Sequence, residues 1–116
     1  MAALTKTKVV EGGIELDFVA VTAVDGDNVA ENPGNVYFVM KNDHASDDSV
    51  FTVEANGDTA QDFPGYGLMN KANQTYTVGP GDVYLAGPFP PDPYNDTDGL
   101  TVKATGGTPT VKAVFI

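Results

Sequence analysis

The chain has 116 residues, of which 41% are hydrophobic, so it is long enough for one domain, residues 1–116, with a core of its own. Its formal net charge is -10 and its six basic residues are all lysines, so we expect it to be repelled by nucleic acids and anionic membranes. It contains no cysteine, which excludes disulfides and cysteine-based catalysis, and no apolar run approaches the roughly 18 residues of a membrane span.

Alternation of apolar and polar residues predicts a series of short strands, and no segment has a convincing helical period. Residues 4–10 are the first candidate strand, and residues 14–18 are the second, with Ile14, Leu16 and Phe18 facing inwards. Residues 36–41 are apolar on both faces, which is typical of a central strand. The remaining candidate strands are residues 51–55, 75–78, 83–86, 100–105 and 110–115.

Turn-forming residues separate these strands. Residues 78–83 contain Gly79-Pro80-Gly81 and predict a tight hairpin between two strands, whereas residues 56–72 have little pattern and predict a surface loop. About eight short strands with regular turns predict an all-β fold. The expected fold class is an antiparallel β-sandwich, jelly-roll-like, and an immunoglobulin-like sandwich is the alternative that the pattern does not separate from it.

Residues 87–99 join two of the predicted strands and hold four prolines within six residues: Pro88, Pro90, Pro91 and Pro93. Because proline fixes φ and lacks a backbone N–H, this stretch is predicted to be neither helix nor central strand. We expect a stiff, ordered loop that carries the aromatic rings of Phe89 and Tyr94.

The candidate catalytic and metal-binding groups lie in loops. His44, the sole histidine, is so close in sequence to Ser46 that a catalytic triad is not expected. Turns also hold the paired carboxylates Asp25/Asp27, Asp47/Asp48 and Asp96/Asp98, where aspartate is common for its backbone hydrogen bonds. Structural calcium is an alternative for two of these turns, because oxygen-bearing side chains stand at alternate positions in residues 25–28 and 95–99. Both segments lack the final Glu of a complete calcium loop. The sequence therefore predicts no catalytic residue, no cofactor, no metal and no enzyme.

One pattern in the second half of the chain carries a resemblance. It consists of Tyr76-Thr77-Val78-Gly79-Pro80-Gly81, Val83-Tyr84-Leu85-Ala86, Gly87-Pro88-Phe89-Pro90-Pro91, Tyr94-Asn95-Asp96 and Asp98-Gly99. This run resembles a family of small tailed-bacteriophage capsid decoration (cement) proteins, whose members show "tvpag", a short strand and then "GPFPP..YND.DG". Residues 34–42 are more loosely similar to the family strand "g.tfl.vkN". The chain departs from the family at Pro80 and in the acidic residues 43–48.

The resemblance implies a virion protein, made in the host bacterial cytoplasm, that sits on the outer capsid surface. Such proteins often form homotrimers and clamp neighbouring copies of the major capsid protein. The acidic, arginine-free composition fits the outside of a particle better than contact with packaged DNA. Two other classes stay open, namely a head–tail connector or tail component, and a carbohydrate-binding module with exposed aromatic rings on one face.

The proline-rich loop supplies the first candidate contacts with a partner. Phe89 and Tyr94 are expected as anchors, because aromatic residues dominate interface energetics and the prolines pre-order the loop. The alternative for Phe89 is packing within the protein's own core. Further candidates are Pro88, Pro90, Pro91 and Asn95 from the same loop, and Leu4 and Lys6 from residues 1–9. The N-terminal candidates are included because an open edge strand can add to a neighbour's sheet.

Overall fold

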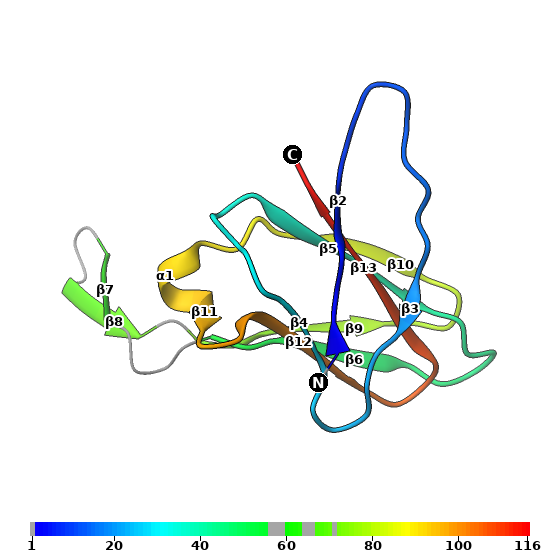
Figure 1. Cartoon of the computed structure of the whole chain (residues 1–116). Coiled ribbons are helices and arrows are strands. Elements are labelled where there is room, and N and C mark those ends of the chain that lie inside the picture. The colour runs from blue at the N-terminus through cyan, green and yellow to red at the C-terminus, as the bar shows by residue number, and fades with distance from the viewer. Residues whose placement is uncertain (1, 56–59, 64–66, 71) are drawn as a thin grey trace.

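The computed structural model describes residues 2–55, 60–63, 67–70 and 72–116. Two β-sheets pack face to face, and a two-stranded hairpin stands to one side (Figure 1). The predicted all-β sandwich is thereby confirmed. The elements are β1 (Ala2–Ala3), β2 (Lys6–Lys8), β3 (Val19–Ala20), β4 (Asp27–Val29), β5 (Val36–Asn42), β6 (Ser49–Val53), β7 (Ala60–Phe63), β8 (Gly67–Asn70), β9 (Gln74–Val78), β10 (Val83–Ala86), α1 (Pro91–Tyr94), β11 (Asn95–Asp96), β12 (Gly99–Thr105) and β13 (Pro109–Phe115). No helix in the described residues is long and apolar enough to cross a membrane.

The strand pairing is that of a jelly roll. The six-stranded sheet has the order β1-β4-β12-β6-β9 with β11 beside β12, and the five-stranded sheet has the order β10-β5-β13-β2 with β3 also beside β13. Eight of these strands form four antiparallel pairs: β3–β13, β4–β12, β5–β10 and β6–β9. In chain order, the first of the eight pairs with the last, the second with the seventh, the third with the sixth and the fourth with the fifth. A long hairpin wrapped into two sheets gives this pattern, which favours the jelly roll over the immunoglobulin-like alternative.

The N-terminal segment makes both sheets mixed rather than purely antiparallel. β1 runs parallel to β4 in one sheet, and β2 runs parallel to β13 in the other. Residues 2–8 therefore pass from the six-stranded to the five-stranded sheet along one side of the sandwich. Of the predicted strand over residues 4–10, only residues 6–8 form a strand, because the chain changes sheets between β1 and β2.

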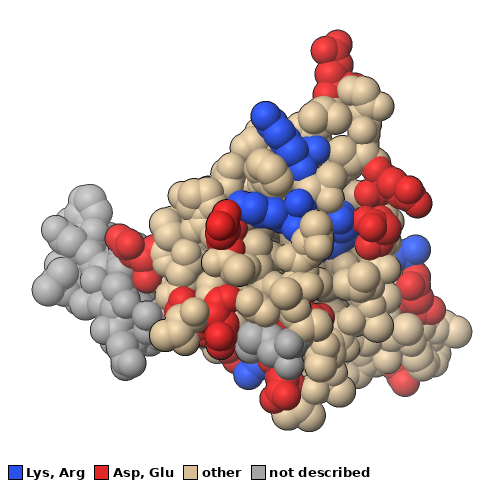
Figure 2. All heavy atoms as spheres, viewed as in Figure 1, with Lys and Arg blue, Asp and Glu red and all other residues tan. Residues whose placement is uncertain are grey.

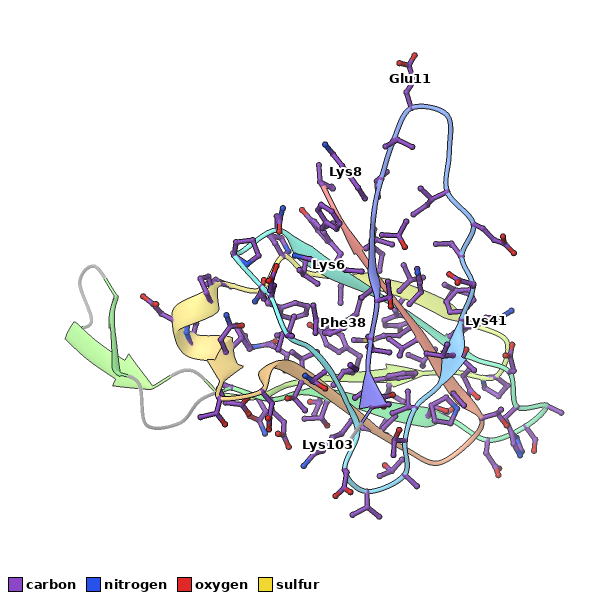
Figure 3. The ribbon with its side chains drawn as sticks, viewed as in Figure 1. Lys6, Lys8, Glu11, Phe38, Lys41 and Lys103 are labelled. Atoms are coloured by element: carbon purple, nitrogen blue, oxygen red, sulfur yellow. The ribbon has the colours of Figure 1, made fainter. Side chains whose placement is uncertain are left out.

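The core lies between the inner faces of the two sheets. Phe38, Met40 and Phe51 are its largest fully buried side chains, and Figure 3 shows Phe38 pointing into the interior. The predicted alternation is confirmed on β6, where residues 49, 51 and 53 are buried and the residues between them are not. On β12 and β13 burial does not alternate, because four consecutive residues, 99–102 and 111–114, are buried. β5 lies between β10 and β13, which confirms it as a central strand.

A buried asparagine connects three loops at one end of the sandwich. The Asn42 amide group donates to the carbonyl oxygens of Asp47 (2.7 Å) and Val78 (3.0 Å). Its Oδ1 accepts from the backbone N–H groups of His44 (3.0 Å) and Thr108 (3.1 Å). The side chain is fully buried, so it replaces water for four backbone groups that the loops would otherwise leave unpaired.

The prediction of a strand over residues 14–18 is wrong. Residues 9–18, here called the arm, rise from β2, turn and return to β3 without a strand partner (Figure 1, blue). Ile14 and Phe18 are half-buried and Leu16 is exposed. The alternation arises because the arm places side chains against the outer face of the five-stranded sheet rather than in the sandwich core.

Three further expectations change. The turn over residues 79–82 joins β9 to β10, but these strands belong to different sheets, so it is an arch and not a hairpin. Residues 60–63 and 67–70 pair as the β7–β8 hairpin, and the rest of the predicted loop, residues 56–59, 64–66 and 71, lies outside the described residues. The proline-rich stretch includes the one-turn helix α1, because a proline at the first helical position lacks only an N–H that has no helical partner there.

Candidate interaction surface

The two aromatic rings of the proline-rich loop are packed inside the protein. Phe89 is 3% exposed and Tyr94 is 4% exposed. The Phe89 ring lies 5.8 Å from the ring of Phe38 and 5.2 Å from that of Tyr94, the second pair edge to face. The structure therefore places Phe89 in the core, the alternative considered above, and leaves neither ring accessible as an anchor in this conformation.

An asparagine pair holds this loop against the sandwich. Asn32 is buried, and its amide group donates to the carbonyl oxygen of Phe89 (2.9 Å) and to Oδ1 of Asn95 (3.0 Å). The Asn95 amide group donates in return to the carbonyl oxygen of Asn32 at 2.9 Å. Pro88 and Pro90 are exposed, and Pro91 is half-buried at the start of α1. Of the predicted loop contacts, only Pro88 and Pro90 are exposed, whereas Pro91 and Asn95 are half-buried.

The two N-terminal candidates also make internal contacts. Leu4 is half-buried against the core, and its N–H donates to the carbonyl oxygen of Asn28 at 2.7 Å. Lys6 Nζ donates to the carbonyl oxygen of Glu31 at 2.9 Å and lies 4.9 Å from the centre of the Phe115 ring. These contacts anchor the N-terminal segment to its own sandwich.

The arm is fixed to the five-stranded sheet by two lysines. Lys112 is buried on β13, and its Nζ lies 2.9 Å from Oδ1 of Asp17. The hydrogen bond from Lys112, together with its charge, holds the pKa of the Asp17 carboxyl below its ordinary value. Lys41 Nζ lies 5.5 Å from the centre of the Phe18 ring. The lower part of the arm is therefore held in place by charge as well as by apolar contact.

An apolar groove of about 400 Å³ opens between the arm and the outer face of the five-stranded sheet. Its lining is Val9, Ile14 and Leu16 from the arm, Tyr37, Val39, Leu85 and Val114 from the sheet, and Ile116. Tyr37 and Val39 lie on the face of β5 opposite to the core residue Phe38. This second apolar face explains why the β5 sequence is apolar on both sides.

Strand β10 borders this groove and is an exposed apolar edge. Val83, Tyr84 and Leu85 are 52%, 42% and 68% exposed, although all three are large apolar or aromatic residues. β10 pairs only with β5, so its other edge is open in the described structure. Exposed apolar strands at an open edge are sites of association with other chains. The sequence signal was three consecutive large apolar residues in a short strand, which alternation alone does not identify as exposed.

Charge is divided unequally between the two sheets. The strands of the five-stranded sheet contain no acidic residue and four lysines, Lys6, Lys8, Lys41 and Lys112. Figure 2 shows lysines gathered on one part of the surface with acidic side chains around them, and Figure 3 places Lys103 apart from Lys6, Lys8 and Lys41. The acidic residues lie on the arm, in loops and on other strands. The five-stranded sheet is thus the part of the chain least repelled by another acidic protein.

The candidate catalytic groups are used in loop structure. His44 Nδ1 accepts from the backbone N–H groups of Ser46 (3.1 Å) and Asp47 (2.9 Å), so the ring braces its own loop. Nε2 lies 3.6 Å from Oδ2 of Asp47. The contacts of Ser46 and His44 thus run through the serine backbone, which is not the arrangement of a nucleophile and its base.

The aspartates that suggested calcium also serve the backbone. Asp27 is buried and accepts from the Thr22 hydroxyl at 2.6 Å and from the Thr22 N–H at 3.2 Å. Asp96 accepts from the N–H of Asp98 at 2.7 Å. Within the part of the chain that the structure describes, no three side chains of the His, Cys, Asp or Glu type come together as metal ligands.

Comparison of the chain with protein-family models, with curated proteins and with solved structures finds no match.

Proposed function

We propose that this protein is a non-enzymatic phage capsid decoration, or cement, protein that binds the outer head surface through its five-stranded sheet. The observation that supports this most directly is the apolar groove on a sheet whose strands carry no acidic residue. A chain with a net charge of -10 otherwise presents an acidic surface that resists close contact with most proteins. The identity of the partner, the major capsid protein, comes from the resemblance of residues 73–102 to decoration proteins.

The proposed mechanism is mechanical. The groove rests on a capsid subunit, while the acidic loops and the six-stranded sheet face solvent. Contacts with neighbouring subunits oppose the outward pressure of packaged DNA. Because several copies or several contacts act together, each single contact can be weak and still raise the stability of the whole particle.

Substitutions on opposite faces of the sandwich test this orientation. Leu16→Lys places a charge in the groove, at a position that is 44% exposed, so folding is expected to tolerate it. Val50→Lys places the same charge on β6 of the other sheet, at 37% exposure, and is the matched control. Each variant is mixed with heads of the parent phage that lack this chain, and the bound fraction is measured by co-sedimentation.

We expect Leu16→Lys to lower head binding at least tenfold and Val50→Lys to leave it unchanged. Equal binding by both variants would remove the five-stranded sheet as the contact face. A copy number on purified virions separates the classes of virion protein, because decoration requires hundreds of copies and a head–tail component only a few. A carbohydrate-binding module would instead expose a row of aromatic rings. Among the aromatic side chains outside residues 56–71, Tyr84 is the one that the structure shows as exposed.

A further inference from the structure

The open edges of the two sheets differ in how they are protected. On one side of the sandwich, β1 is two residues long and β2 carries Lys6 and Lys8. Short edge strands and lysines are common devices against edge-to-edge pairing. On the other side, neither β9 nor β10 carries a charge, but β9 exposes the polar Thr75 and Thr77, whereas β10 exposes Val83, Tyr84 and Leu85. Of the described edges of the two packed sheets, β10 is therefore the longest apolar one that lacks such protection.

The backbone groups available on β10 follow from its pairing with β5. The N–H of Asn42 donates to the carbonyl oxygen of Asp82 at 3.2 Å, so residues 42 and 82 stand at a hydrogen-bonded position of the register, although the N–H of Asp82 itself donates to Gly79. Such positions alternate with non-bonded positions along antiparallel strands. In the observed register, Tyr84 is therefore bonded to β5, while the N–H and C=O groups of Val83 and Leu85 point to the open edge.

We propose that β10 pairs antiparallel with β10 of a second copy of this chain, around a twofold axis at Tyr84. In this register Val83 of one copy meets Leu85 of the other, and both residues present free backbone groups. Two hydrogen-bonded pairs then form, and the five-stranded sheets join into one ten-stranded sheet. A register centred on Val83 would place Leu85 opposite Gly81. That register is less favourable, because the Gly81 N–H already donates to the carbonyl oxygen of Asn42 at 2.8 Å and cannot also bond Leu85.

Charge favours this edge for self-association. Two copies that each carry a charge of -10 repel one another, and the repulsion is least where the meeting strands carry no acid. The flanking Asp82 of one copy faces Ala86 of the other in the proposed register, so no two carboxylates are opposed. Because the remaining repulsion is long-range, added salt should tighten the dimer by screening it.

The inference goes beyond capsid binding and does not depend on it. A twofold dimer would place two grooves on one continuous sheet, so a single assembly could contact two capsid subunits. It also differs from the homotrimer that the resemblance implies, and the mass of the assembly in solution separates the two.

Single cysteines test the register directly, because the chain has none of its own. In the proposed dimer, the Cα atoms of the two copies of residue 84 lie about 4.5 Å apart, as in any non-hydrogen-bonded antiparallel pair. That distance is within the range of about 4.4–6.8 Å that a disulfide spans. The two copies of residue 83 are offset by two residues along the strands and lie about 9 Å apart, beyond reach.

We expect Tyr84→Cys to form a disulfide-linked dimer under mild oxidation and Val83→Cys, the matched control, to stay mostly unlinked. Sedimentation of the unmodified chain should give twice the chain mass, and more of it at higher salt. Val83→Lys should return the mass to that of one chain. A single-chain mass for the unmodified protein, a threefold mass, or equal cross-linking at both positions would overturn the proposal.

The same variants keep this inference separate from the proposed function. Val83 does not line the groove. If Val83→Lys is monomeric and still binds phage heads, decoration does not require the dimer. A dimer that persists in Leu16→Lys while head binding is lost supports two distinct surfaces. A dimeric protein that binds no heads would retain this proposal and remove the decoration function.

Discussion

Phe89 decides between the two roles considered for the proline-rich loop, and truncating it gives a measurable answer. The ring is almost completely buried and contacts the rings of Phe38 and Tyr94. Phe89→Ala removes it from a core in which all three rings are packed at one end of the sandwich. The structure therefore predicts a loss of folding stability, and not merely a loss of partner binding.

The magnitude follows from the burial of the ring. Replacing a buried phenylalanine by alanine costs about 3–5 kcal/mol, which includes the lost aromatic contacts and the cavity. Pro88 and Pro90 on either side are exposed, so the loop can partly collapse into the space and the cost should fall near the lower end, about 3–4 kcal/mol. At roughly 4 °C per kcal/mol for a domain of this size, the melting temperature should fall by about 12–16 °C.

Urea denaturation followed by circular dichroism measures this change in the free energy of unfolding. Phe89→Leu, which retains most of the apolar volume, should give an intermediate loss, and Val50→Ala on the surface should change stability by less than about 0.5 kcal/mol. Head binding is then measured well below the melting temperature of Phe89→Ala. A variant with unchanged stability and abolished head binding would refute the core assignment and restore Phe89 as an anchor.

Three other predictions concern single contacts. Asn42→Leu should cost about 2–4 kcal/mol in urea denaturation, because it leaves four backbone groups without their hydrogen bonds, among them the Val78 carbonyl in a buried bond. A change below about 1 kcal/mol would contradict that role. The lowered pKa of Asp17 means that its contribution to stability is present above about pH 4 and is lost as the pH falls through the lowered value. Amide-exchange protection factors in residues 9–18, which correct for the intrinsic pH dependence of exchange, should fall over that range in the unmodified chain. In Asp17→Asn they should be low at every pH, and protection that does not change with pH in the unmodified chain would contradict the role of Asp17. Val24 is exposed and has a φ of 70°, which is unfavourable for a β-branched residue. Val24→Gly should therefore raise the melting temperature by a few degrees. An unchanged or lower melting temperature would show that the Val24 side chain makes a compensating contact.

The strands of the sandwich could be predicted because apolar residues recur at every second position between turn-forming residues. On β6 this alternation matches one-sided burial, whereas on β12 and β13 the residues between the core positions are also buried, as the sequence did not indicate. The central position of β5 was also predictable, since apolar residues on both of its faces require cover on both. The pairing of first strand with last is not a local property, so the jelly-roll arrangement emerged only from the registers.

The candidate surface was less predictable for the same reason. Ile14, Leu16 and Phe18 alternate like a strand, although they belong to an arm that lies on the outside of the sheet. The alternation of apolar residues indicates that these side chains pack against an apolar surface. It does not indicate whether that surface is the sandwich core or the outer face of a sheet. The open edge of β10 depends on the strand order, which separates it from its chain neighbour β9.

The closure of the sandwich end by residues 87–99 bears on how relatives of this protein should be sought. Its recognisable residues are occupied internally, with Phe89 and Tyr94 in the core and Asn95 bonded to Asn32. A match to this segment reports that another chain closes its fold in the same way, whatever that chain attaches to. Two proteins that share the segment can differ completely on β10 and the arm, so those positions are the ones to align before a common partner is assigned.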